Sequence, residues 1–126
     1  MKRLWVVPVL AIILAILCSS TVRSVNRFCR DGCDRLEQSV ALLDTGDSDG
    51  AAQLLWTVED DFQKWRLLSN AFLRHAEMDP VQEALTEAAA SAEIGEWTDF
   101  RTACRQAQMR LAHLAENEAL TLGNLW

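Results

Sequence analysis

The sequence contains few of the residues that interrupt helices or build tight turns. Its 126 residues include five glycines, two prolines and no tyrosine, while 50% of the residues are apolar. So few turn-forming residues argue against a sandwich of short strands, and the length fits one domain of ordinary size. The chain also lacks a low-complexity tract that would indicate disorder. A single folded domain is therefore expected.

Positive charge is also scarce. The chain has 12 Lys and Arg residues against 18 Asp and Glu residues, which gives a net charge of −6 at pH 7. Nucleic-acid phosphates require a contiguous cationic surface on the protein that binds them. We therefore expect no nucleic-acid partner.

Catalytic motifs are missing as well. The sequence contains no H-E-x-x-H motif, no phosphate-binding glycine loop and no G-x-S-x-G motif. His75 and Glu77 match the H-x-E half of zinc deaminases, but no P-C-x-x-C follows them. We therefore expect no catalytic residue, no metal site and no cofactor, and we interpret His75 and His113 as structural residues.

Charged side chains are absent from residues 4–22. Lys2 and Arg3 precede this segment, which is apolar without interruption through Cys18 and ends on small or β-branched residues. A helix of this length extends about 28 Å, close to the bilayer's hydrocarbon thickness of about 30 Å. The pattern predicts a membrane anchor at residues 1–22, embedded in the membrane through residues 4–22.

Two other fates of this segment stay open. A cleaved signal peptide needs small residues near its cleavage site, and Cys18 and Ser20 meet that requirement only weakly. A lipoprotein signal is disfavoured because the large residue Leu17 precedes Cys18. We favour an uncleaved anchor, and since a short basic N-terminus usually stays inside the cell, residues 23–126 are expected outside the cytoplasm. The prediction is a single-pass protein of the cell membrane.

The segment that follows the apolar run is basic, although the rest of the chain is acidic. Arg23, Arg27, Arg30 and Arg35 all lie within its first 13 residues. Each could attract an anionic lipid headgroup if it lies at a membrane surface. Ordinary solvated charge beside an anchor is the alternative interpretation.

Apolar residues in the rest of the chain recur at alternating steps of three and four, which is typical of helices packed on one face. Turn residues at 44–50 and Gly95 divide the pattern, and Asp79-Pro80 predicts the start of a third helix. Residues 120–126 are apolar and are expected to fold back onto the other helices. The predicted fold is all-α, with one N-terminal transmembrane helix followed by an antiparallel bundle of three to four helices in residues 23–126. The apolar stripes are Cys29, Cys33, Leu36, Val40 and Leu43; Leu55, Val58, Phe62, Trp65, Ser69 and Phe72; Val81, Leu85, Ala88 and Ala92; and Phe100, Cys104, Ala107, Leu111 and Leu114.

A combination of short sequence features spans nearly the whole chain. These features are the opening Met1–Val6, Cys33 after the apolar segment, the Gly46-Asp47 break, Trp65 in the second helical segment and the ending Leu120–Trp126. Together they resemble a family of short, uncharacterised, N-terminally membrane-anchored helical proteins of Gram-positive bacteria, a domain of unknown function. The resemblance implies an anchored helical protein with a membrane-protein partner, and it brings no catalytic residues. Cys29 and Cys104 depart from the family's pattern.

Three cysteines form one group of candidate functional residues. Cys29 and Cys33 are four residues apart and share a helix face, and Cys104 lies on a stripe that should also face inward. Outside the cytoplasm a disulfide of Cys104 with Cys33, or with Cys29, becomes possible, and its loop of about 70 residues would contribute about 4 kcal/mol. Buried free thiols are the alternative. A zinc site would need His75 or His113 as a further ligand, and C-x3-C is not a usual zinc spacing.

Tryptophans form the second group. Trp65 falls on a core stripe, whereas Trp56 lies beside that stripe and Trp97 opens the last helix. Exposed tryptophans anchor many interfaces, so Trp56, Trp97 and Trp126 are the candidate interaction surface. Burial of the tryptophans in the core is the alternative interpretation. The favoured function is a membrane-anchored accessory or interaction protein whose helical body docks on a membrane partner. The alternative is a small extracytoplasmic thiol-redox or metal-binding protein that uses the three cysteines.

Overall fold

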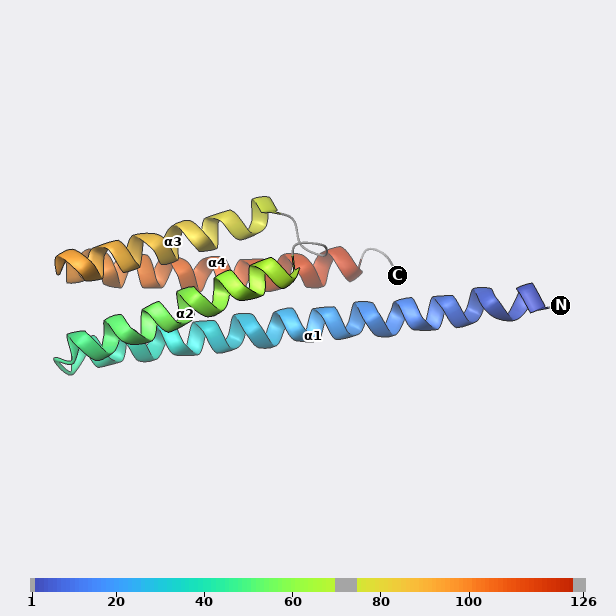
Figure 1. Cartoon of the computed structure of the whole chain (residues 1–126), viewed down its shortest axis with the longest axis horizontal. Helices are drawn as coiled ribbons and strands as arrows, with labels where there is room; N and C mark the ends of the chain where they lie inside the picture. Colours follow the sequence, from blue (N-terminus) through green and yellow to red (C-terminus); the bar gives the residue numbers. More distant parts are fainter. Residues whose placement is uncertain (1, 70–74, 124–126) are drawn as a thin grey trace.

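The described part of the chain is helical except for two short turns. The computed structural model describes residues 2–69 and 75–123, and these residues form four α-helices and no strand (Figure 1). The helices are α1 (Lys2–Asp44), α2 (Ser48–Ser69), α3 (His75–Ile94) and α4 (Trp97–Gly123). The predicted all-α class is confirmed.

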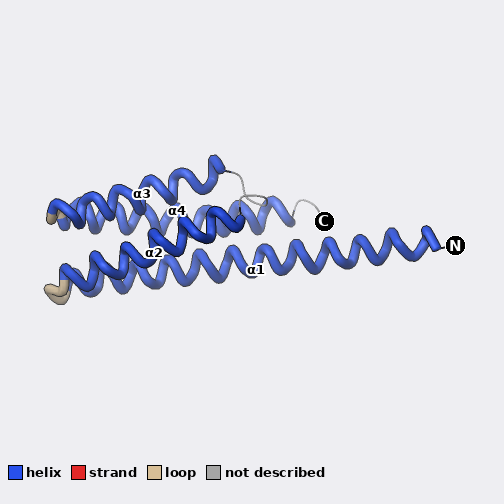
Figure 2. The backbone as a smooth tube through the Cα atoms, in the orientation of Figure 1, coloured by secondary structure: helices blue, strands red, loops and turns tan. Residues whose placement is uncertain are grey.

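Helix α1 is much longer than its neighbours. Its 43 residues run without a break through both the apolar segment and the first apolar stripe, so the sequence boundary at residue 22 lies inside a helix. Pro8 lies in the second turn, where a missing backbone donor disturbs the helix less than in its middle. The N-terminal half of α1 projects beyond the other helices as a single rod (Figure 2).

Two glycine turns reverse the chain, as the sequence predicted. At the end of α1, Gly46 has φ of 91°, and the Asp47 N–H donates to the Leu42 carbonyl at 2.9 Å. At the end of α3, Gly95 has φ of 74°, and the Glu96 N–H donates to the Ser91 carbonyl at 2.9 Å. Both are glycine caps in the left-handed region, which a side chain would strain. Consecutive helices therefore run in opposite directions (Figure 1).

The predicted start of α3 at Asp79-Pro80 is wrong. The helix begins at His75, and Pro80 is its sixth residue. A proline there removes only one hydrogen bond near the start of the helix, so the first turn can form before it. The Asp79 carboxylate forms an ion pair with Arg66 of α2 instead of capping the helix.

The predicted stripes form one shared core. Helix α1 packs on α2 and α4, and α3 packs on the same two helices, so the four helices form a ring around a single core. The buried residues include Val25, Cys29, Leu36 and Val40 of α1, Leu55, Val58 and Phe62 of α2, Met78, Val81, Leu85 and Ala88 of α3, and Phe100, Cys104, Ala107, Leu111 and Leu114 of α4. Cys33, Leu43, Trp65 and Ala92 are partly buried and pack against them.

Close contact between α1 and α4 depends on a small residue. Gly32 lies on the buried face of α1, and a Cβ atom there would meet Leu111 Cδ1 at 3.0 Å. The sequence predicted that residues 120–126 fold back onto the other helices. The structure describes only the backbone of residues 120–123, which continues α4 as a helix to Gly123. Phe72 and Trp126 lie outside the described residues.

Candidate functional site

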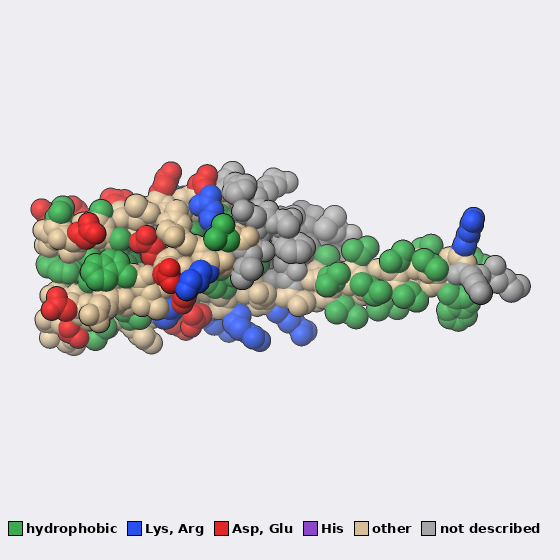
Figure 3. All heavy atoms as spheres, in the orientation of Figure 1, with side chains coloured by type: hydrophobic (Ala, Val, Ile, Leu, Met, Phe, Trp, Pro, Cys, Tyr) green, Lys and Arg blue, Asp and Glu red, His purple; other side chains and the backbone are tan. Residues whose placement is uncertain are grey.

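The N-terminal half of α1 exposes large apolar side chains on every side. Leu4 is 77% exposed, Trp5 75% and Ile16 63%. An 18-residue window in this helix has a mean hydropathy of 2.4, and none of it is buried against the described residues. Figure 3 shows apolar side chains covering the projecting rod. The helix is long and apolar enough to cross a membrane.

A polar cluster joins the middle of α1 to α4. The Gln108 side-chain amide donates to the Cys33 carbonyl at 3.0 Å and to Glu37 Oε2 at 3.1 Å, and Arg105 donates to the same Glu37 oxygen at 3.1 Å. The hydrogen bond from Gln108, and then the one from Arg105, lower the pKa of the Glu37 carboxyl. This cluster fixes the register between the two helices and shows no sign of a reacting group.

Cys33 and Cys104 lie at this same contact of α1 with α4. Cys29 and Cys104 are buried, and no disulfide joins any of the four cysteines in the described residues. The Cys33 thiol donates to the Gln108 carbonyl at 3.4 Å, one helical turn beyond Cys104. The structure thus brings Cys33 and Cys104 to one interface, and a disulfide between them stays a prediction.

Burial suppresses the reactivity of these thiols. It raises the pKa of Cys104 to about 12, and burial, followed by the nearby Asp34 carboxylate, raises the pKa of Cys33. The thiolate is the nucleophile and the metal ligand, so both groups are weak in either role at neutral pH. Within residues 2–69 and 75–123, no three His, Cys, Asp or Glu side chains gather closely enough to hold a metal ion. His113 is exposed on α4, and the His75 side chain lies outside the described ones.

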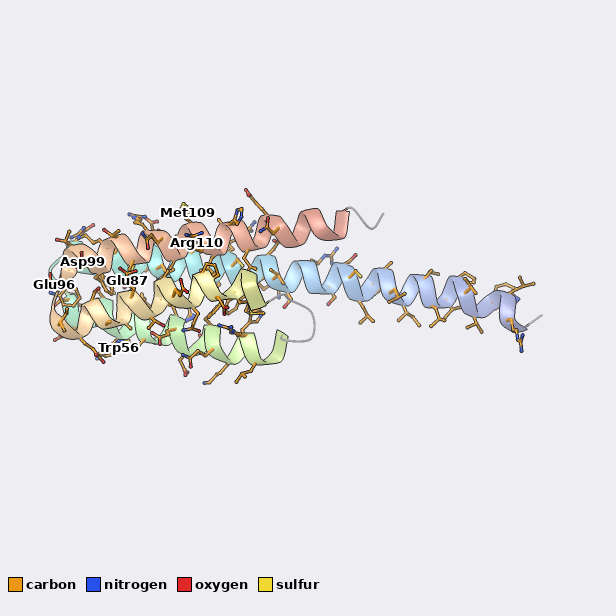
Figure 4. The ribbon with its side chains drawn as sticks, turned by 90° about the horizontal axis from the view of Figure 1, so that it is seen from above. Trp56, Glu87, Glu96, Asp99, Met109 and Arg110 are labelled. Atoms are coloured by element: carbon orange, nitrogen blue, oxygen red, sulfur yellow. The ribbon has the colours of Figure 1, made fainter. Side chains whose placement is uncertain are left out.

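The tryptophans divide into packed and exposed members. Trp65 stacks on Phe28 of α1 with ring centroids 4.3 Å apart and planes 4° apart. Trp97 is half-buried and meets Phe100 edge-on at 5.4 Å. Trp56 is 46% exposed and projects from the α2 side of the molecule, opposite Met109 of α4 (Figure 4). Of the two predicted surface tryptophans that the structure describes, Trp56 and Trp97, Trp56 therefore has the more exposed indole.

A shallow groove surrounds Trp56 where α2 meets α3. Its lining, which we call the Trp56 groove, consists of Trp56, Glu59, Asp60, Gln63, Ala89 and Glu93. Burial, and then the charge of Glu93, raises the pKa of Glu59. The Glu59 Oε2 atom is buried and has no hydrogen-bond partner among the described residues. The groove therefore combines an aromatic face with the carboxylates of Glu59 and Glu93, while its third carboxylate, Asp60, pairs with Lys64 at 3.0 Å.

The sequence did not single out Phe28 or Glu59. Phe28 lies at the edge of the Cys29 stripe, three residues after the buried Val25, and its ring stacks on Trp65. Glu59 lies within an acidic run that resembles any solvated helix face, and only the packing of α3 reveals its burial.

Comparison of this chain with protein-family models, curated proteins and solved structures yields no match. The family resemblance stays a prediction.

Proposed function

We propose that this protein is a membrane-anchored accessory protein whose helical body docks on a membrane partner. The observation that carries this proposal is the projecting half of α1, an apolar helix with none of its most apolar window buried against the described residues. Such a surface is unfavourable in water and is stable in lipid, where a helix satisfies its own backbone hydrogen bonds. In this proposal residues 4–22 form a single membrane span, and the rest of the chain lies outside the cytoplasm.

The continuity of α1 supports a rigid position of the body at the membrane. The span and the core stripe belong to one helix, so the body cannot swing freely as it would on a glycine-rich linker. The ends of α2 and α4 and the start of α3 lie toward the span, and the two glycine turns lie at the far end (Figure 1). The side of the body that meets a partner is thereby fixed.

The Trp56 groove is the surface we propose for docking. The hydrogen bonds from Ser39 to Ala51 and from Arg35 to Asp61 set the register between α1 and α2. By that register, Trp56 lies beside residues near 37 of α1, roughly 20 Å along the helix axis from the end of the proposed span. The partner we propose is a membrane protein with a basic segment at that height, because an indole ring beside carboxylates favours a cationic contact.

The thiol-based alternative has less support. Its three cysteines lie in or against the core, and burial raises the pKa of Cys104 and of Cys33. A redox or metal-binding cysteine needs a stabilised thiolate and access to solvent. Neither Cys33 nor Cys104 has that environment.

Photo-crosslinking in native membranes tests the docking proposal. A photoreactive phenylalanine replaces Trp56 in one full-length variant and Met109, an exposed residue on the opposite side, in a control variant. We expect a discrete crosslinked product from position 56 and none from position 109. Adding Glu93→Lys, which reverses one charge of the groove, should weaken the product. Equal products at both positions, or a product insensitive to Glu93→Lys, would contradict docking through this groove.

A further inference from the structure

Three arginines of α1 form a cationic stripe that faces away from the helical body. Arg23, Arg27 and Arg30 are separated by four and three residues, which places them on one helix face, and all three are exposed. The opposite face, which includes Val25 and Cys29, is buried against the other helices. Figure 3 shows basic side chains at this junction of the apolar rod and the body, on the side of α1 away from the other helices.

The charge of this arginine stripe is not neutralised within the described residues. None of the three arginines forms an ion pair there, although α1 also carries Arg35, which binds Asp61 at 2.7 Å and Asp31 at 3.3 Å. No acidic residue precedes Asp31 in the sequence. Two exposed carboxylates lie beyond the stripe: Asp34, one turn after Arg30, and Asp31, which pairs with Arg35. A chain with a net charge of −6 thus keeps an unpaired basic segment at one place on its surface.

A surface groove along α1 connects this stripe with the apolar segment. Its lining changes along the helix from the aliphatic Ile12 and Ile16, through the hydroxyls of Ser19 and Ser20, to the guanidinium of Arg23 and Arg27. A second hollow continues along Arg23, Asn26, Arg27 and Arg30, and the carboxylates of Asp31 and Asp34 line its remaining part. A phospholipid presents its chemistry in the same order, with acyl chains, then glycerol esters, then a phosphate. From Arg23 to Arg30 the helix rises about 10 Å, on the scale of one headgroup layer.

We infer that this groove binds an anionic phospholipid of the surrounding bilayer. The acyl chain lies along Ile12 and Ile16, the serine hydroxyls face the ester region, and Arg23 and Arg27 hold the phosphate, with Arg30 adding charge above it. Guanidinium groups suit this role because they donate paired hydrogen bonds to phosphate oxygens and remain charged. The inference rests on the proposed anchoring of residues 4–22, and it adds a lipid class and a site to it.

Lipid selectivity of the full chain in vesicles tests the inference. The protein is reconstituted in phosphatidylcholine vesicles that contain a trace of spin-labelled phosphatidylglycerol or spin-labelled phosphatidylcholine, and the motionally restricted fraction of each label is measured. We expect the anionic label to associate about threefold to tenfold more strongly at low salt, and the preference to shrink at high salt as screening shortens the reach of the charges. The triple variant Arg23→Gln, Arg27→Gln and Arg30→Gln should lose the preference.

A matched control removes the same charge elsewhere. Lys64→Gln, Arg101→Gln and Arg110→Gln change three exposed basic residues of α2 and α4 that lie outside the Gln108–Glu37 cluster, and they should leave the preference intact. Equal association of the two labels, or an equal loss in both triple variants, would overturn the inference. Displacement of the anionic label by millimolar inorganic phosphate, but not by sodium chloride of the same ionic strength, would assign the site to a free phosphate and overturn it as well. Retention of the full-length protein in pure phosphatidylcholine vesicles is measured separately. A protein that is not retained there would contradict the proposed anchoring, and the lipid inference would fail with it.

Discussion

Single buried groups decide what this protein's side chains can do. Ser39 is fully buried, and its hydroxyl donates to the Ala51 carbonyl at 2.7 Å, so its polarity is satisfied. Glu59 is the opposite case, because one of its oxygens is buried without a described partner. Cys104 is buried among apolar side chains and keeps its proton. The burial and hydrogen bonding of these three side chains follow from the packing of the helices and cannot be predicted from the residue types alone.

Replacing Glu59 with glutamine should stabilise the fold at neutral pH. Burial raises the pKa of Glu59 above its unfolded value of 4.5, so the folded chain binds the proton more tightly than the unfolded chain. The resulting destabilisation is absent below pH 4, grows as the pH rises through the raised pKa, and stays present above it. Thermal unfolding of the full chain in detergent should show a higher Tm for Glu59→Gln at pH 7.5 and an unchanged Tm near pH 3.5. Glu83→Gln, at an exposed position of α3, is the control, and an equal rise in its Tm would contradict the explanation.

The buried thiol of Cys104 should resist alkylation until the protein unfolds. Its pKa of about 12 leaves almost no thiolate at pH 8, and the side chain is inaccessible in the fold. Mass spectrometry after iodoacetamide treatment should find Cys104 unmodified in the native protein and modified in denaturant. Rapid native labelling would restore the thiol-redox alternative. Loss of two hydrogens from the unreduced chain, mapped to Cys33 and Cys104, would establish the predicted disulfide.

At the scale of helices, the periodic part of the fold was predictable and the non-periodic part was not. The stripes around Leu36, Phe62, Leu85 and Leu111 gave the correct inward faces, because burial of one helix face imposes a step of three and four. The start of α3 was misplaced because proline tolerates several positions near a helix start. The unbroken α1 was not foreseen. The change from apolar to charged residues at Arg23 marks the end of the apolar segment, but no helix-breaking residue lies there, so the helix continues into the part that packs on α2 and α4.

The candidate site was predictable to a smaller extent. Trp56 was recognisable because a large aromatic side chain beside a core stripe has few places to be buried. The bonding of Gln108 to Glu37 and the burial of Glu59 depend on the register between two helices. Polar side chains do not recur at a regular spacing in the sequence, so a single sequence does not reveal how two packed helices align along their axes.

The glycine turn after α1 gives a prediction at this scale. Gly46 has φ of 91°, and a Cβ atom there would meet nothing within 4 Å. Any cost of Gly46→Ala is therefore conformational, about 1 kcal/mol, with no contribution from a clash. Gly46→Asn should cost less because asparagine tolerates the left-handed region. Denaturant unfolding should rank the stabilities as glycine, asparagine, alanine, and an alanine variant as stable as the parent would contradict the assigned turn geometry.

At the scale of the whole molecule, the protein is a helical body on an apolar rod. The rod and body share α1, so anything that binds the rod also orients the body and the Trp56 groove. The arginine stripe lies at the joint between the two. The proposed span lies in the bilayer. The arginine stripe and then the Trp56 groove follow it along the same axis, at increasing distance from the proposed bilayer.

The measurement that tests this account most directly is alkaline extraction of membranes from cells that make the full chain, followed by the intact mass of the protein in each fraction. Alkaline carbonate releases peripheral proteins and leaves transmembrane helices in the bilayer. We predict that the chain stays in the membrane pellet, leaves it only with detergent, and retains residues 1–22. Release of the chain into the carbonate supernatant, or a pelleted chain that lacks those residues, would contradict an anchor formed by α1.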